Sequence, residues 1–161
     1  MRLVAFVGPS NSGKTSIVER LVPALSDRGL RVAYLKHSSH GFEMDHKGKD
    51  TARIYESGAI GVAIAGKEEC AARLRSGGAR PPDELARLFF PDADLVLVEG
   101  FKESGLPKIE VRPAEGSPLL EGDDPWLIGI LGSADDPRPQ PRFDPDSPED
   151  FERLVDFVAG A

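Results

Sequence analysis

The eight residues from Gly8 to Thr15 constrain the fold of this chain more than any other segment. They read G-P-S-N-S-G-K-T and match the phosphate-binding pattern G-x-x-x-x-G-K-[ST]. The apolar run Leu3–Val7 before them is typical of a buried parallel strand, and Lys14–Asp27 after them carries apolar side chains at helical spacing. A simple glycine- and serine-rich turn is the alternative, but strand, loop and helix occur in the order that a phosphate-binding loop requires.

The chemistry of such a loop explains its residue types. Gly8 and Gly13 allow the backbone to curl so that its N–H groups point at phosphate oxygens, close to the positive end of the following helix. The ammonium group of Lys14 can reach the β- and γ-phosphates, and the Thr15 hydroxyl can bind Mg²⁺. The sequence therefore predicts a site for a nucleoside triphosphate with Mg²⁺.

Apolar periodicity along the rest of the chain predicts strands that alternate with helices. The expected strands are Leu3–Val7, Arg31–Leu35, Ile60–Ala65, Glu69–Leu74, Asp94–Val98, Lys108–Val111 and Trp126–Leu131. The expected helices are Lys14–Asp27, Lys49–Ser57, Pro81–Phe89 and a last one that is capped by Ser147 and runs through Val158. This order indicates an α/β fold with a mostly parallel sheet of the P-loop NTPase type and flanking helices. The 161 residues fit one domain, residues 1–161.

Residues 113–145 interrupt this pattern, because they carry many prolines and acidic side chains. The clearest breaker is Pro137–Pro141, which reads P-R-P-Q-P. We expect surface connections here, and no second domain.

Glu99 is the second chemical feature, because it follows the apolar strand Asp94–Val98 directly. The carboxyl ends of strands in a doubly wound sheet face the ligand, so Glu99 should lie beside the loop Gly8–Thr15. It is the candidate catalytic residue, and with Thr15 it is a candidate Mg²⁺ ligand. An ordinary acidic residue at a strand exit is the alternative.

The segment from Lys36 to Thr51 is the third feature, because it follows a predicted strand and contains all three histidines of the chain. A site for a transition metal could use His37, His40, His46 and Asp45. Their spacing matches no closed zinc pattern, and no cysteine is near. A polar loop that contacts phosphate or a protein partner is the favoured interpretation, with Lys36, Lys47, Lys49 and Arg53 as sources of positive charge.

Composition excludes several classes. The net charge of −7 argues against a nucleic-acid-binding protein. Cys70 is the one cysteine, so no intrachain disulfide can form. The first strand begins at the N-terminus, which is untypical of a signal peptide, and no apolar stretch approaches the roughly 20 residues that span a bilayer. We expect a cytoplasmic protein that binds neither nucleic acid nor membrane.

The chain resembles the MobB family, the adaptor proteins of molybdopterin-guanine dinucleotide biosynthesis. The resemblance covers roughly residues 1–112. It rests on G-P-S-N-S-G-K-T from Gly8, K-H-S-S-H-G-F-E-M-D from Lys36, G-K-D-T-A-R from Gly48, V-E-G-F-K from Val98 and P-K-I-E-V from Pro107. Thr51 stands where serine is expected in the family, and this change keeps the hydroxyl.

The resemblance implies a P-loop fold that binds GTP, weak or no independent GTPase activity and a homodimer. It also implies partnership with MobA, the guanylyltransferase that joins GMP to molybdopterin, and molybdopterin itself and molybdoenzyme-maturation factors are further candidate partners. The chain has no N-K-x-D segment to recognise guanine. Asp135, in the loop after Trp126–Leu131, could accept hydrogen bonds from guanine N1 and N2, and a surface turn is the alternative.

Two other classes stay open. A small-molecule kinase would use the same phosphate loop, and Arg73, Arg75 and Arg80 could form a lid over transferring phosphate or a solvated hairpin. A purely structural nucleotide-binding module is the other class. The candidate cofactors are Mg²⁺ and GTP, the nucleotide that the resemblance implies. The candidate nucleotide-binding residues are Gly8, Pro9, Ser10, Asn11, Ser12, Gly13, Lys14, Thr15, Ser16, Lys36, His37, Asp45, Lys49 and Asp135.

Overall fold

The computed structural model describes residues 1–39, 41–42, 48–113, 120, 124–132 and 136–160. The chain divides into two compact units. The larger unit consists of Met1–His37 and Pro81–Ala161, and the smaller unit is Ser38–Arg80. The expectation that the whole chain is one domain stays a prediction.

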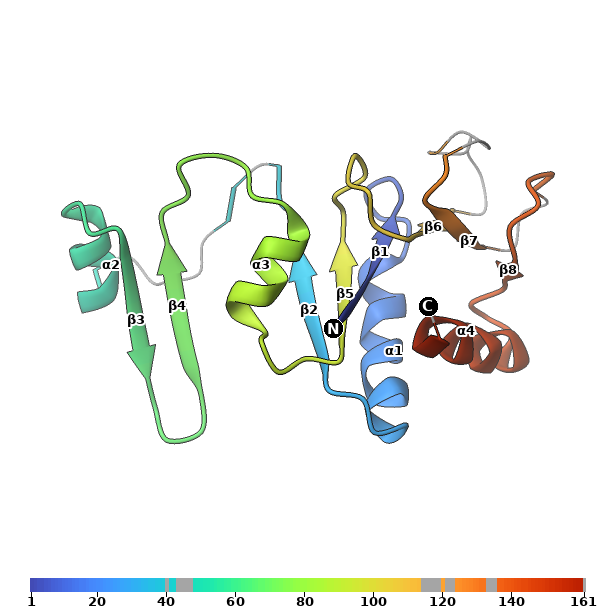
Figure 1. The fold of residues 1–161 in the computed structure, drawn as a ribbon, viewed down its shortest axis with the longest axis horizontal. Coiled ribbons are helices and arrows are strands. Elements are labelled where there is room, and N and C mark those ends of the chain that lie inside the picture. Colours follow the sequence, from blue (N-terminus) through green and yellow to red (C-terminus); the bar gives the residue numbers. More distant parts are fainter. Residues whose placement is uncertain (40, 43–47, 114–119, 121–123, 133–135, 161) are drawn as a thin grey trace. The chain divides into compact units, whose positions relative to one another are not determined.

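A six-stranded sheet forms the centre of the larger unit, among its described residues (Figure 1). Its strands are β1 (Arg2–Val7), β2 (Val32–Lys36), β5 (Leu95–Glu99), β6 (Lys108–Val111), β7 (Leu127–Leu131) and β8 (Arg142–Phe143). Their order is β2-β5-β1-β6-β7-β8, and every neighbouring pair is parallel. The carboxyl ends of all these strands therefore lie along one edge, where parallel sheets bind ligands.

Two apolar cores cover the two faces of this sheet. Along β1, Val4 and Phe6 belong to one core while Ala5 and Val7 belong to the other, because successive side chains of a strand point to opposite faces. The first core also contains the apolar faces of α1 (Lys14–Asp27) and α4 (Pro148–Gly160), and the second contains Ala86 of α3 (Pro82–Phe89). Helices on both faces explain why β1 and β5 are continuous apolar runs.

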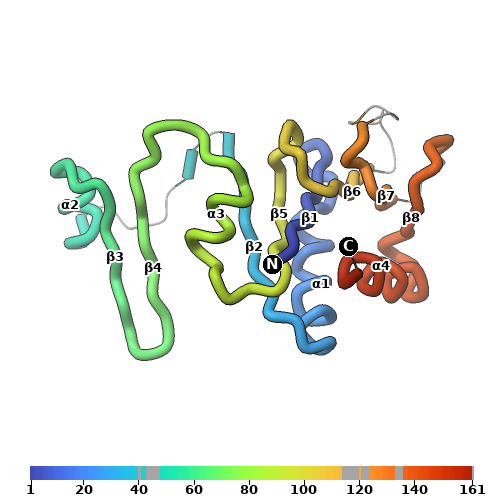
Figure 2. Tube along the Cα trace, viewed as in Figure 1, coloured from blue at the N-terminus to red at the C-terminus, as the bar shows by residue number. Residues whose placement is uncertain are grey.

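The smaller unit combines α2 (Asp50–Glu56) with the antiparallel hairpin of β3 (Gly61–Ala65) and β4 (Cys70–Leu74), as the tube in Figure 2 shows. The Tyr55 ring of α2 lies against the guanidinium groups of Arg73 and Arg75, at 4.0 and 4.2 Å. Arg75 also donates to the carbonyl of Tyr55 in α2, and to that of Ala59 at 2.9 Å. Cation–π contacts and hydrogen bonds thus join the helix to the hairpin.

The α/β fold with a mostly parallel sheet is confirmed, and each expected strand and helix is present within a residue or two at its ends. Strand β8 was missed, because two residues carry no periodicity. The expectation that residues 113–145 form only surface connections is wrong for part of this segment. Leu120 and Phe143 are buried in the apolar cores, and the Arg138 side chain, which is 8% exposed, pairs with the acidic side chains of Glu110 and Asp136. No helix in the described part of the chain is both long and apolar enough to cross a bilayer.

Candidate functional site

The phosphate-binding loop lies between β1 and α1, at the carboxyl edge of the sheet. At Gly8 the backbone passes so close to β6 that a Cβ atom would lie 2.3 Å from the carbonyl oxygen of Val111. Asn11 and Gly13 have φ values of 62° and 92°, in the left-handed region that asparagine and glycine tolerate best. The backbone conformation of the loop therefore explains why glycine stands at positions 8 and 13 and asparagine at position 11.

The Lys14 side chain folds back over this loop. Its Nζ donates to the carbonyls of Gly8 and Pro9, at 3.0 and 2.6 Å. Partial burial lowers the pKa of Lys14, nearby Glu99 acts in the opposite direction, and Lys36 adds to the lowering. A cation at the mouth of the loop suits the charge of a polyphosphate.

Glu99 is the centre of a hydrogen-bonded cluster at the ends of β2 and β5. Thr15 Oγ1 and Tyr34 Oη donate to its Oε2 at 2.9 and 2.6 Å, and Lys36 Nζ lies 2.9 Å from its Oε1. The Glu99 residue is 7% exposed. The sequence-based expectation that this carboxylate lies beside the loop therefore agrees with the geometry.

The environment of Glu99 favours its charged form. Burial raises the pKa of the carboxyl group, but hydrogen bonds from Tyr34, Lys36 and Thr15 outweigh burial and hold it below its usual range. Burial and the bond to Glu99 in turn raise the pKa of Tyr34. Glu99 is consequently a weak base, well suited to holding a cation.

The turn after Glu99 is strained and packs against the end of β2. Gly100 has a φ of 90°, and a Cβ atom there would lie 3.2 Å from the Cβ of His37. Phe101 follows with a φ of 53°, and its ring centroid is 4.8 Å from that of His37. A bulky residue in this conformation costs free energy and is held by its surroundings. His37 therefore lies against the turn that follows Glu99, and its role in nucleotide binding stays a prediction.

The donor set fits Mg²⁺. The hydroxyl oxygen of Thr15 and a carboxylate oxygen of Glu99 lie 2.9 Å apart, and both are hard oxygen ligands of the kind this cation prefers. Among the described residues, no group of three or more His, Cys, Asp or Glu side chains is arranged to hold a metal ion. Because His40, Asp45 and His46 lie outside the described residues, the transition-metal interpretation stays untested.

The structure also shows the elements to which several other residues named in the sequence analysis belong. Ser16 lies exposed in the first turn of α1, and Lys49 belongs to the smaller unit, directly before α2. Asp135, the candidate for guanine recognition, lies outside the described residues. Arg73 and Arg75, two of the arginines named for a possible lid, stack on the Tyr55 ring, and the lid itself stays untested.

Tyr34 is the site residue that sequence reasoning missed. It lies two residues before Lys36 in β2, so both side chains point to the same face of the strand. The available signal was the hydroxyl of Tyr34, which stands among the apolar residues Val32, Ala33 and Leu35 of this strand. Its partner, Glu99, is 65 residues away in sequence, and only the strand order brings the two together.

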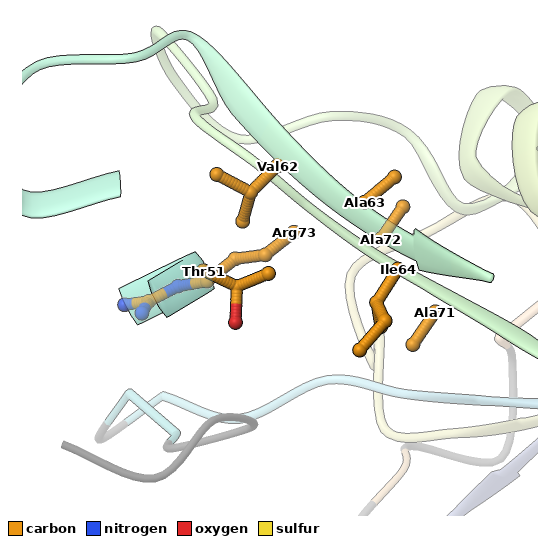
Figure 3. Close-up of a pocket in the computed structure, with 7 residues that line it drawn as sticks. All are labelled: Thr51, Val62, Ala63, Ile64, Ala71, Ala72 and Arg73. Atoms are coloured by element: carbon orange, nitrogen blue, oxygen red, sulfur yellow. The ribbon is translucent and has the colours of Figure 1, made fainter. Parts of the chain in front are cut away.

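The smaller unit contains a shallow hollow along one face of its hairpin (Figure 3). Its lining residues are Thr51, Val62, Ala63, Ile64, Ala71, Ala72 and Arg73. Most of them are small and apolar, with the Thr51 hydroxyl and the Arg73 guanidinium as the polar groups. This lining contains no residue of the phosphate-binding loop.

Comparison with known proteins identifies the family. Residues 3–132 match the family model of molybdopterin guanine dinucleotide synthesis protein B, MobB. The chain belongs to the MobB family. The resemblance noted from the sequence is thereby confirmed.

Relatives and solved structures agree with this assignment. The molybdopterin-guanine dinucleotide biosynthesis adapter protein of Haemophilus influenzae is 37% identical over 129 residues, which are 80% of this chain and 72% of that protein. The adapter protein of Escherichia coli is 34% identical over 66% of this chain, and the match spans 63% of that protein. The crystal structure of Bacillus subtilis MobB is 28% identical, with a TM-score of 0.75 and complete coverage of both chains. The structure of a MobB homologue from Bacillus stearothermophilus gives a TM-score of 0.71 at 25% identity, again over both whole chains.

Proposed function

We propose that this protein binds GTP with Mg²⁺ and acts as an accessory factor when molybdopterin is guanylated to molybdopterin-guanine dinucleotide. One observation carries the proposal: a complete phosphate-binding loop stands beside a buried Glu99 in a chain of the MobB family. The names of the Haemophilus influenzae and Escherichia coli relatives point to the same pathway.

Each site residue has a distinct role in this proposal. The loop N–H groups and Lys14 bind the phosphates, while Thr15 and Glu99 hold Mg²⁺. Bound Mg²⁺ would neutralise charge on the β- and γ-phosphates. Lys36, whose Nζ lies 2.9 Å from Glu99 Oε1, would add positive charge beside the residues that would hold the phosphates and Mg²⁺.

Slow hydrolysis is expected from the state of Glu99. Its carboxylate already accepts hydrogen bonds from Thr15 and Tyr34 and pairs with Lys36, and its pKa lies below the usual range. A general base works best with a pKa near the working pH. Glu99 is therefore better suited to holding the metal than to activating water.

The partners follow from the same role. The protein would supply or position GTP for MobA, the guanylyltransferase, in the cytoplasm. Molybdopterin and molybdoenzyme-maturation factors are further partners that it would bind there. Selection of guanine over other bases belongs to this proposal, with Asp135 as the candidate acceptor for guanine N1 and N2.

A homodimer is also part of the proposal, and the smaller unit supports it. Its hairpin presents large apolar side chains to solvent, with Ile60, Ile64 and Leu74 between 47% and 86% exposed. A two-stranded hairpin is marginally stable alone, and clustered exposed apolar groups mark interaction surfaces. A second copy of this chain is the partner we assign to that surface.

Light scattering tests the dimer. The wild-type protein should have twice the monomer mass, and Ile64→Lys should lower the measured mass toward that of the monomer.

Reconstitution tests the function. Molybdopterin cofactor, GTP, Mg²⁺ and MobA are combined with and without this protein, and guanylated product is quantified. We expect more product with the wild-type protein, no gain with Lys14→Ala, and slow GTP turnover by the protein alone. Rapid ATP-dependent phosphorylation of a small metabolite, without an effect on guanylation, would show a P-loop kinase instead.

A further inference from the structure

Lys36 brings a positive charge of the protein itself to the carboxylate that would hold Mg²⁺. It is the last residue of β2 and lies beside Glu99 in the register of the parallel strands β2 and β5. Its Nζ lies 2.9 Å from Glu99 Oε1, while Oε2 accepts hydrogen bonds from Thr15 and Tyr34. One oxygen of this carboxylate is thus already paired with a cation.

The two partners of this ion pair differ in their exposure to water. The Glu99 side chain is 9% exposed, whereas the Lys36 side chain is 51% exposed. Solvent and salt screen a partly buried pair much less than a fully exposed one. The charge of Lys36 therefore acts strongly on any other ion that approaches Glu99 Oε1.

Lys14 is a second cation close to the same carboxylate, but it is engaged differently. Its Nζ donates to the loop carbonyls of Gly8 and Pro9, at 3.0 and 2.6 Å. Burial lowers the pKa of Lys14 most, Glu99 acts in the opposite direction, and the positive charge of Lys36 adds to the lowering. Two ammonium groups therefore lie near one buried carboxylate, and these three groups together carry a positive charge.

This balance of charge has opposite consequences for a cation and for an anion. A divalent cation that binds Glu99 without a nucleotide meets the like charge of Lys36, and like charges at close range are unfavourable. A polyphosphate is attracted by Lys36 and Lys14, and its negative charge offsets the repulsion between Lys36 and the cation. The same side chain thus opposes the metal alone and favours the polyphosphate.

We propose that Lys36 makes the binding of Mg²⁺ conditional on a bound polyphosphate. This inference rests on the proposed binding of GTP with Mg²⁺ and adds a role for one residue of that site. In the nucleotide-free protein, Lys36 lowers the affinity of Glu99 for divalent cations. Because linkage is reciprocal, the metal and the polyphosphate each raise the affinity of the protein for the other. Mg²⁺ therefore enters the site together with the nucleotide rather than alone.

Lys36→Met tests the inference with a metal and no nucleotide, because methionine removes the charge and keeps an unbranched side chain. Mn²⁺ suits the same oxygen ligands as Mg²⁺, and electron paramagnetic resonance measures how much of it stays free. At neutral pH, we expect the variant to bind Mn²⁺ about 5-fold to 150-fold more tightly than the wild type, the usual range of coupling between sites.

The anion is tested with inorganic tripolyphosphate by calorimetry. In the presence of EDTA, Lys36→Met should bind tripolyphosphate more weakly than the wild type, because one attractive charge is lost. With Mg²⁺ present, the affinity should change little, since the lost attraction for phosphate and the lost repulsion of the metal oppose each other. A purely structural role of Lys36 would not strengthen binding of the cation and weaken binding of the anion.

Three further variants locate the effect. Lys36→Arg keeps the charge and should keep the low affinity for Mn²⁺. Lys102→Met is the matched control, because the Lys102 side chain is 45% exposed and its Nζ lies 4.0 Å from a carboxylate oxygen of Glu103. It removes one positive charge of similar exposure and should leave the affinity for Mn²⁺ nearly unchanged. Adding Glu99→Gln to Lys36→Met should remove the gain in Mn²⁺ affinity.

The outcomes separate this inference from the proposed function. An unchanged or lower Mn²⁺ affinity in Lys36→Met would overturn the inference while GTP binding stands, and so would an unchanged affinity for metal-free tripolyphosphate. A gain of equal size in Lys102→Met, or one that survives Glu99→Gln, would also overturn it. Wild-type protein that binds neither GTP nor tripolyphosphate would overturn both proposals. If Lys36→Met does not fold, Lys36→Gln takes its place in every measurement.

Discussion

At the scale of single residues, Glu99 illustrates how a buried charge is kept charged. The hydroxyls of Tyr34 and Thr15 both donate hydrogen bonds to one carboxylate oxygen of Glu99, and the ammonium group of Lys36 pairs with the other. Removing any of these donors leaves part of the desolvation penalty without compensation. The stability of the folded protein should therefore respond to the loss of a single donor atom around Glu99.

Tyr34→Phe should destabilise the protein in a pH-dependent way. It removes a hydrogen bond to a charged group, which contributes about 1.5–3 kcal/mol. The pKa of Glu99 is lowered in the folded protein, so this stabilisation is present above its ordinary value of 4.5 and is lost as pH falls through the folded value. The difference in unfolding free energy between variant and wild type should be largest near pH 7 and shrink below pH 4.5.

Denaturant unfolding at several pH values measures this difference. Tyr55→Phe is the control, because the contacts of Tyr55 to Arg73 and Arg75 go through its ring. A Tyr34→Phe defect of the same size at pH 7 and at pH 3.5 would show that lost packing, rather than the bond to Glu99, is responsible.

At the scale of elements, the sequence determined much of the site in advance. Apolar runs located β1 and β5, the G-K-T signature located the loop, and the position of Glu99 at the carboxyl end of β5 implied that the loop and this carboxylate would meet. The cluster around Arg138 could not be predicted, because its contacts join residues 18 and 28 positions apart with no periodic pattern. A proline-rich, acidic stretch ordinarily indicates exposed loops. Here the Arg138 side chain instead holds part of the stretch against Glu110 and Asp136.

Gly8→Ala tests the close approach between β1 and β6. An added Cβ would lie 2.3 Å from a backbone carbonyl, so one strand must shift, and overpacking of this kind costs about 1–3 kcal/mol. Gly160→Ala is the control, since nothing lies within 4 Å of a Cβ at that position. We expect a clear fall in melting temperature for the first variant and little change for the second. Equal melting temperatures would mean that the loop can move away from β6 freely.

At the scale of the whole molecule, the two units differ in how they are stabilised. In the larger unit, β1 and β5 are buried under apolar side chains on both faces. In the smaller unit, most residues of β3 and β4 are exposed. Segments with few buried contacts open more easily than a packed core. Ligand binding in the larger unit should therefore stabilise that unit selectively.

Hydrogen exchange with and without Mg²⁺-GTP can test this selectivity. A ligand at 100 times its Kd adds about 2.7 kcal/mol to the stability of the state that binds it. We expect slower exchange in β1, the phosphate-binding loop and β5, because they carry Lys14, Thr15 and Glu99, and little change in the β3–β4 hairpin. Lys14→Ala should abolish the effect, since it removes a charge aimed at phosphate while the apolar core stays intact. Slower exchange confined to the hairpin, or the same protection in Lys14→Ala, would place the nucleotide outside the loop.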